Sequence, residues 1–212
     1  MGVSERKERE KQARKESILD AARRVFQEKG YHSTTMNKIA EEAELSKATL
    51  YLYFKNKDDL FLSMTTEPLK KLKKEFEKIA TTDKNPEEKI VLLSHTFIKQ
   101  WNNNREAYQL GDTFIATYNP QSEAHRTLFN KMNKILGEIL NIGVRIIENG
   151  IKTGLFKNNI DPEKVILVGW RTLAGLLQVI NIVDIFKKEG VFTNEILDLA
   201  IRTFFDGITK RA

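Results

Sequence analysis

The stretch STTMNKIAEEAELSKATLYLYFKNK, from Ser33 to Lys57, predicts the fold of the amino-terminal part of this protein. It predicts two short helices joined by a tight turn. Thr35 is placed to cap the first helix and Ser46 the second, because a hydroxyl oxygen can accept from the unpaired N–H groups that open a helix. Two short helices that cross at a steep angle form a helix-turn-helix, whose second helix enters the DNA major groove.

The apolar residues of this stretch recur at helical spacing. In the first helix one face carries Met36, Ile39, Ala40 and Ala43. In the second helix Leu50 and Phe54 stand four residues apart and are expected to face inward. The other side chains of the second helix are therefore expected to point away from the core.

The pattern from Thr35 to Leu60, T-x-x-x-I-A-x-x-A-x-x-S-x-x-T-L-Y-x-Y-F-x-x-K-x-x-L, resembles the DNA-binding signature of the tetracycline-repressor (TetR) family of transcription regulators. A Phe-x-x-x-Gly-Tyr sequence, from Phe26 to Tyr31, stands upstream, where that family has it. The rest of the chain resembles the family in length and helical layout only. The family commonly has glycine in the turn, where this chain has Glu44. If that position needs a left-handed backbone, glutamate costs about 1 kcal/mol relative to glycine.

Composition narrows the class of protein. Of the 212 residues, 41% are hydrophobic and 30% are charged, which is typical of a chain that buries a core. The absence of cysteine excludes disulfides, zinc fingers and thiol catalysis, and it fits a reducing cytoplasm. The net charge of +6 favours an anionic partner. We therefore expect a cytoplasmic protein that binds double-stranded DNA, as the resemblance implies.

Helical periodicity continues along the chain, and no strand pattern occurs. We predict an all-α protein with a three-helix helix-turn-helix DNA-binding domain, residues 1–55, and a helical effector-binding and dimerisation domain, residues 56–212. The two apolar carboxyl-terminal helices, predicted over 162–188 and 193–210, are expected to form the interface of a homodimer.

The apolar run from Val165 to Phe186 approaches membrane-spanning length. Arg171 and Asp184 lie inside it, and such a residue near the centre of a bilayer costs about 2.5–3.5 kcal/mol. A buried helix at a subunit interface is therefore the better interpretation, and we expect no membrane partner.

Residues 1–16 are almost all charged or small. They predict a solvated extension of the first helix. The alternative function is a basic arm that touches phosphate or enters a minor groove. A membrane-surface helix is disfavoured, because the stretch has no apolar face to bury.

The sequence does not contain the groups of common active sites. His32, His95 and His125 are far apart in the sequence, and none lies in a cluster with the spacing of metal ligands. Neither a G-x-S-x-G motif, a phosphate-binding glycine-rich loop nor an H-E-x-x-H motif occurs. We therefore predict no enzymatic activity, no catalytic residue, no metal site and no cofactor.

Side chains on and around the second short helix are predicted to contact DNA. Lys47 can reach guanine or a phosphate, Thr49 can hydrogen-bond a base edge, and Leu52 can contact a thymine methyl group. Tyrosine hydroxyls suit phosphate oxygens, although packing against the first helix is the alternative for Tyr51. With the positions that the family resemblance implies, the predicted DNA-binding set is Thr35, Ser46, Lys47, Ala48, Thr49, Tyr51, Leu52, Tyr53 and Lys57.

Large apolar side chains recur in the carboxyl-terminal helices, where the TetR resemblance implies a pocket for a small molecule. Core packing is the competing interpretation for each of them. Arg171 and Gln178 are the most suggestive, because buried polar groups need partners. The predicted pocket residues are Phe97, Trp101, Tyr108, Phe114, Tyr118, Met132, Leu136, Trp170, Arg171 and Gln178.

These expectations combine into a ligand-responsive DNA-binding regulator. The simplest mechanism is a repressor that a small apolar or amphipathic effector releases from a palindromic operator. The alternative is a helical protein-interaction or DNA-architectural protein without a small-molecule ligand.

Overall fold

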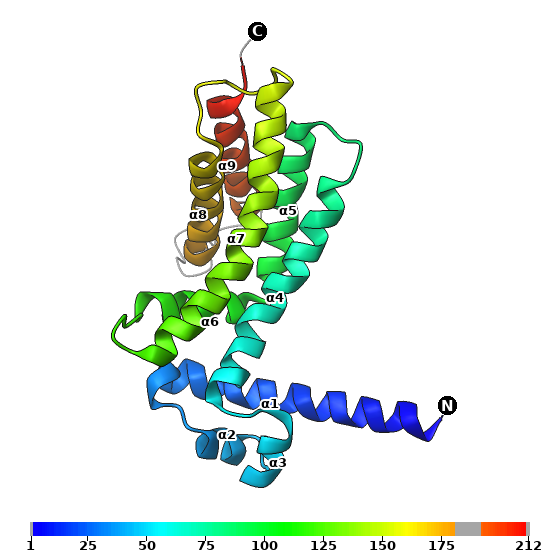
Figure 1. Cartoon of the computed structure of the whole chain (residues 1–212), viewed down its shortest axis with the longest axis vertical. Coiled ribbons are helices and arrows are strands. Elements are labelled where there is room, and N and C mark those ends of the chain that lie inside the picture. Colours follow the sequence, from blue (N-terminus) through cyan, green and yellow to red (C-terminus); the bar gives the residue numbers. More distant parts are fainter. Residues whose placement is uncertain (1, 181–191, 211–212) are drawn as a thin grey trace. The chain divides into compact units, whose positions relative to one another are not determined.

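The computed structural model describes residues 2–180 and 192–210, and the regular structure there is α-helical (Figure 1). The helices are α1 (Val3–Ser33), α2 (Met36–Glu42), α3 (Lys47–Tyr53), α4 (Lys57–Ala80), α5 (Pro86–Asn103), α6 (Arg105–Ala116), α7 (Glu123–Lys152), α8 (Pro162–Ile180) and α9 (Phe192–Ile208). The all-α prediction is confirmed. The part of the predicted helix 162–188 that follows residue 180 lies outside the described residues.

Packing divides the chain into two compact units. One contains Met1–Pro68 and Arg105–Met132, and the other contains Leu69–Asn104 and Asn133–Ala212. Helix α6 and the first turns of α7 therefore belong to the same compact unit as the helix-turn-helix. The predicted functional boundary at residue 55 stays a prediction.

The core of the first unit forms where α1 meets the helix-turn-helix, α4 and α6. Ile18 and Phe26 of α1 are fully buried, at the helical spacing that the sequence shows. The helical path of α1 breaks at Gly30, whose φ of 72° is the left-handed conformation that glycine adopts without steric cost. The break turns Tyr31 into the core, where its ring packs edge-on against Phe61 and Phe114 at centroid distances of 5.0 and 5.5 Å.

The second unit is a bundle of α5, α7, α8, α9 and the carboxyl-terminal part of α4. Asn85 caps α5, because its side chain accepts the Glu88 N–H at 2.9 Å while the Glu88 carboxylate accepts the Asn85 N–H at 3.0 Å. After α7 the chain doubles back, and Phe156 packs directly onto Gly150. Within the described residues, no helix has both the length and the apolarity to cross a membrane.

Candidate functional site

The two short helices of the first unit begin at the predicted caps. The Thr35 hydroxyl accepts the Lys38 N–H at 3.3 Å, and the Ser46 hydroxyl accepts the Thr49 N–H at 3.1 Å. The Ser46 and Thr49 hydroxyls also lie 2.8 Å apart, within hydrogen-bond distance. Helix α2 buries Met36, Ile39 and Ala40, whereas α3 buries Leu50. The local geometry is therefore that of a helix-turn-helix with its second helix largely exposed.

The backbone of the turn between α2 and α3 is left-handed at Glu44, the position where the TetR family commonly has glycine. Glu44 has a φ of 52°, and the Leu45 N–H donates to the Ala40 carbonyl at 2.9 Å to close the turn. A side chain with a Cβ adopts this conformation at a cost of about 1 kcal/mol. The surrounding hydrogen bonds hold the glutamate there.

Helix α3 presents apolar and basic side chains together at the surface. Leu52 is 83% exposed and Tyr51 is 44% exposed, and the Lys47 ammonium lies 6.0 Å from the centre of the Tyr51 ring. Exposed apolar groups among polar ones are typical of a binding surface. An exposed leucine beside a lysine suits a groove that offers both thymine methyl groups and guanine acceptors.

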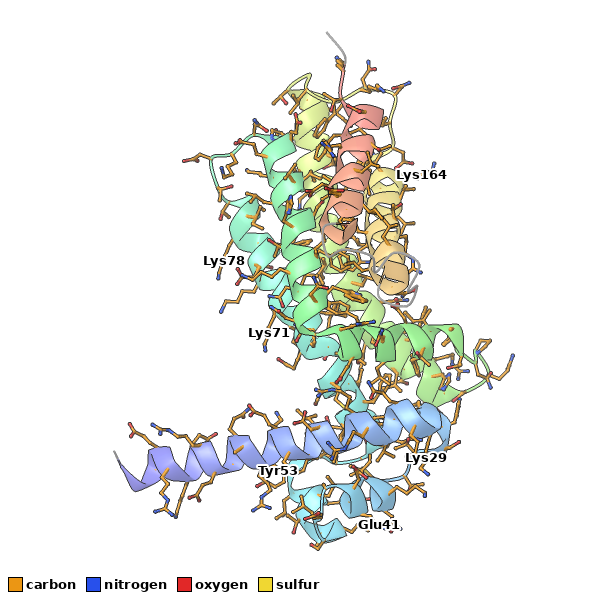
Figure 2. The ribbon with its side chains drawn as sticks, turned by 180° about the vertical axis from the view of Figure 1, so that it is seen from behind. Lys29, Glu41, Tyr53, Lys71, Lys78 and Lys164 are labelled. Atoms are coloured by element: carbon orange, nitrogen blue, oxygen red, sulfur yellow. The ribbon has the colours of Figure 1, made fainter. Side chains whose placement is uncertain are left out.

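The nine predicted DNA-binding residues differ in exposure. Those that are exposed are Thr35, Ser46, Lys47, Ala48, Tyr51 and Leu52, whereas Thr49, Tyr53 and Lys57 are half-buried. Tyr53, labelled in Figure 2, lies on α3. It packs against the core of its unit, so its ring has a structural role whether or not its hydroxyl reaches a phosphate. Contact of these residues with DNA stays a prediction.

Lys57 is held by the end of α1. Its ammonium donates to the carbonyl oxygens of Tyr31 and His32 at 2.8 and 3.3 Å, and it lies 4.3 Å from the centre of the Tyr31 ring. Burial lowers the pKa of Lys57, and the neighbouring Asp58 opposes that shift. The Tyr31 hydroxyl donates to the Asp58 carboxylate. This junction of α1 with α4 is a feature that sequence reasoning missed, although Tyr31 in the Phe-x-x-x-Gly-Tyr sequence marked one of its members.

Two histidines that are far apart in the sequence lie together in the first unit. The His32 and His125 rings stack with centroids 4.4 Å apart. Nδ1 of the fully buried His125 accepts the Asn119 N–H at 2.9 Å, while its Nε2 has no hydrogen-bond partner among the described residues. Burial lowers the pKa of His125, and His32 and Lys57 lower it further. No group of three or more possible metal ligands occurs in the described parts of the chain.

The second unit contains a cavity of about 500 Å³ between α5, α7, α8 and α9. This volume lies within the range of about 300–1,000 Å³ that is usual for small-molecule sites. The polar side-chain groups of the lining residues are the hydroxyls of Ser94, Thr172 and Thr203 and the indole N–H of Trp170. The lining contains no charged side chain among the described residues. Val168 and Leu199 line the cavity and are 59% and 58% exposed, so the cavity opens at the surface of α8 and α9.

The ten predicted pocket residues separate between the two units. Phe97 and Trp170 line the cavity, and their rings lie 4.2 Å apart. Four others are in the same unit outside the lining: Trp101 is buried, Leu136 and Gln178 are half-buried, and Arg171 is exposed. The remaining four belong to the first unit, namely Tyr108, Phe114, Tyr118 and Met132. A polar contact from Arg171 inside this cavity is therefore not part of the structure.

Sequence reasoning missed the part of the lining that comes from α9. Ile196, Leu199 and Phe204 line the cavity, whereas the sequence predicts only a subunit interface for the apolar helix 193–210. Apolar periodicity identifies a buried face without distinguishing a cavity wall from a packed interface. Only the packing of the four helices shows that these residues border an open space.

Comparison with known proteins gives a family match over the helix-turn-helix and relatives that cover most of the chain. Residues 18–64 match the family described as bacterial regulatory proteins, tetR family. The chain is 32% identical over 146 residues to the fatty acid metabolism regulator protein of Bacillus subtilis (strain 168), covering 68% of this chain and 71% of that relative. It is 33% identical over 154 residues to the uncharacterised HTH-type transcriptional regulator YhgD of the same organism, covering 71% and 75%.

A solved structure resembles nearly the whole chain. The transcriptional regulator FadR from Bacillus subtilis, in complex with stearoyl-CoA, superposes with a TM-score of 0.68 at 25% identity. The match covers 90% of this chain and 97% of that protein. The likeness thus extends through the helices that surround the cavity.

Proposed function

The chain belongs to the tetR family of bacterial regulatory proteins and is a helix-turn-helix transcription regulator, and we propose that it is a repressor that an apolar effector releases from DNA. The observation that carries this proposal is α3, which buries Leu50 and exposes Lys47, Tyr51 and Leu52. A short capped helix with this exposed face fits the major groove.

The DNA contacts divide by chemistry. Lys47, Thr49 and Leu52 are proposed to contact base edges, and Tyr51 and Tyr53 are proposed to contact phosphates. Thr35, Ser46 and Ala48 lie at or near the starts of the two short helices, where backbone N–H groups are proposed to donate to a phosphate. Lys57 is proposed to support DNA binding in part by positioning the end of α1, because its ammonium donates to the carbonyl oxygens of Tyr31 and His32.

A homodimer is proposed to form through α8 and α9. Val168 and Leu199 expose large apolar surfaces on these helices, and the same surfaces on a second copy would cover them. Two-fold symmetry would then present two α3 helices to successive half-sites of a near-palindromic operator. The second copy would also cover the opening of the cavity, since Val168 and Leu199 belong to its lining.

The effector is proposed to be a hydrophobic molecule, such as one with a long acyl chain. The uncharged lining favours an apolar ligand, with the hydroxyls of Ser94, Thr172 and Thr203 and the indole N–H of Trp170 as candidate hydrogen-bond partners. The FadR relative was solved with stearoyl-CoA, a ligand that has such a chain. Arg171 lies outside the lining, so this residue is not proposed to bind the effector. Effector binding would favour a dimer whose α3 helices are wrongly spaced for the operator.

We propose no catalytic role, because the relatives are transcription regulators and the uncharged cavity offers no acid–base pair. A DNA partner and a chain without cysteine support a cytoplasmic location.

The test is a gel-shift titration of the full chain against random DNA fragments, followed by selection of the operator from the bound fraction. Lys47→Ala should cost about 1–3 kcal/mol of affinity for the selected operator. The same titration with palmitoyl- and stearoyl-CoA present should release the operator. An unchanged operator affinity of the Lys47→Ala, Leu52→Ala double variant would overturn the assignment of α3.

A further inference from the structure

The first turns of α1 carry their basic residues on one face. At about 100° per residue, Lys7, Lys11, Arg14 and Lys15 fall within about 60° of the direction of Ile18. All four side chains are exposed, and none has an ion pair among the described residues. We call these four residues the basic stripe.

The acidic residues of the same segment lie beside or opposite the basic stripe, and three of the four are engaged by neighbours. The Glu10 carboxylate pairs with Arg6 at 2.8 Å, and Glu16 accepts from the Gln12 side chain at 2.9 Å. Glu5 accepts the Gly2 N–H at 3.2 Å. The acidic residues of the first turns of α1 therefore do not neutralise the positive charge of the basic stripe.

The basic stripe continues the face of α1 that packs on the helix-turn-helix. Ile18 belongs to the core that contains Leu50 and Phe54. Lys15, three residues before Ile18, has its ammonium 5.9 Å from the centre of the Phe54 ring, immediately after α3. In Figures 1 and 2, α2 and α3 lie on one side of α1, and the amino-terminal turns of α1 extend past α3. The stripe thus begins at the end of α3 and extends about 12 Å beyond it, from Lys15 to Lys7.

We propose that the basic stripe binds the phosphates of double-stranded DNA that flank the half-site contacted by α3. The inference rests on the proposed DNA binding and extends its footprint beyond the helix-turn-helix. Lysine and arginine on an exposed helix can each neutralise a phosphate and release a counterion. A lipid surface is the other anionic partner to consider. It is disfavoured because residues 1–16 have no apolar face to insert into a membrane.

The experiment compares two charge-matched double variants of the full chain. Lys7→Gln with Lys11→Gln removes two charges from the stripe, and Arg6→Gln with Arg9→Gln removes two charges from the opposite side of α1. Each is titrated against a random-sequence duplex of about 30 base pairs over a salt series, with circular dichroism to confirm equal helicity. Loss of two phosphate contacts per protomer should reduce the slope of log affinity against log salt by about 1.8 per protomer in the stripe variant only.

The outcomes separate this inference from the proposed function. Equal slopes for both double variants and the wild type would overturn the stripe while DNA binding by α3 stood. An equal loss in both variants would mean that net charge, not the stripe, matters, and it would overturn the inference as well. Failure of the wild type itself to bind the duplex would overturn the proposed function. Vesicles that contain phosphatidylserine serve as the lipid probe, and stripe-dependent binding to them without any DNA effect would assign the arm to membranes instead.

Discussion

Glu44 occupies a backbone conformation that glycine adopts more easily. Its φ of 52° lies in the left-handed region, where a Cβ approaches the following carbonyl oxygen. We expect Glu44→Gly to raise the free energy of unfolding by about 0.5–1 kcal/mol, because the local strain disappears. Chemical denaturation with urea measures the change.

Glu41→Gly provides the matched control for this prediction. Glu41 is also exposed and carries the same charge, but it lies inside α2. Glycine inside a helix lowers stability by about 1 kcal/mol. The two substitutions should therefore shift stability in opposite directions, and a loss of stability in both would show that Glu44 is not strained.

At the scale of the elements, His125 joins α7 to the end of α1. The charged or titratable groups near its ring are His32 and Tyr31 on α1, Lys57 on α4, and Tyr118 between α6 and α7. The Asp58 carboxylate is bonded to the Tyr31 hydroxyl. Its pKa is lowered in the folded state, so the unfolded chain binds the proton more readily. This contribution to stability is complete above the ordinary histidine pKa of about 6.5 and is lost as the pH falls below it.

We expect His125→Phe to remove most of the stability difference between about pH 7.5 and 5.5, a window in which histidine titrates and carboxylates scarcely do. Urea unfolding at the two pH values measures it. His95→Gln changes an exposed histidine on α5 and should leave the difference in place. A pH dependence that persists in His125→Phe would contradict the role of this ring.

The close approach of Phe156 to α7 depends on Gly150. A Cβ at position 150 would lie 2.1 Å from Cδ2 of Phe156, which is fully buried and cannot move freely. We expect Gly150→Ala to cost about 1–3 kcal/mol, the usual range for overpacking. Gly137 also lies within α7, but a Cβ added there would meet no neighbouring atom within 4 Å. Gly137→Ala should therefore stabilise the folded state by about 1 kcal/mol. Thermal unfolding of both variants tests the contrast.

At the scale of the whole molecule, the exposed apolar side chains of α8 and α9 predict the assembly state. We expect light scattering of the wild type to show about 49 kDa, twice the chain mass of 24.5 kDa. Val168→Glu with Leu199→Glu should give a folded monomer, because two copies would then bring four carboxylates into the interface. Ile115→Glu, which changes an exposed apolar residue of α6, is the control and should remain dimeric. A wild-type monomer at micromolar concentration would contradict the prediction.

The sequence by itself determined the helices of the first unit and the geometry of their starts. The caps at Thr35 and Ser46 and the inward Leu50 follow from interactions within about four residues. Such interactions depend on backbone hydrogen bonding and on the helical period, and both are predictable from residues that are close together in the sequence. The left-handed backbone at Glu44 was raised only by the glycine that the TetR family commonly has in this turn. The Thr35–Leu60 pattern indicated the family because it resembles that family's DNA-binding signature, and residues 18–64 match the family.

Only the tertiary structure decided which distant residues meet. The stacking of His32 on His125, and the hold of Lys57 on the α1 carbonyls, join segments whose approach no local pattern encodes. The cavity is the clearest case, since only Phe97 and Trp170 of the predicted pocket residues line it, beside unpredicted residues of α9. Apolar side chains line ligand cavities and packed helix interfaces alike, so residue type alone does not tell the two apart. The way in which four helices pack against one another decides between them.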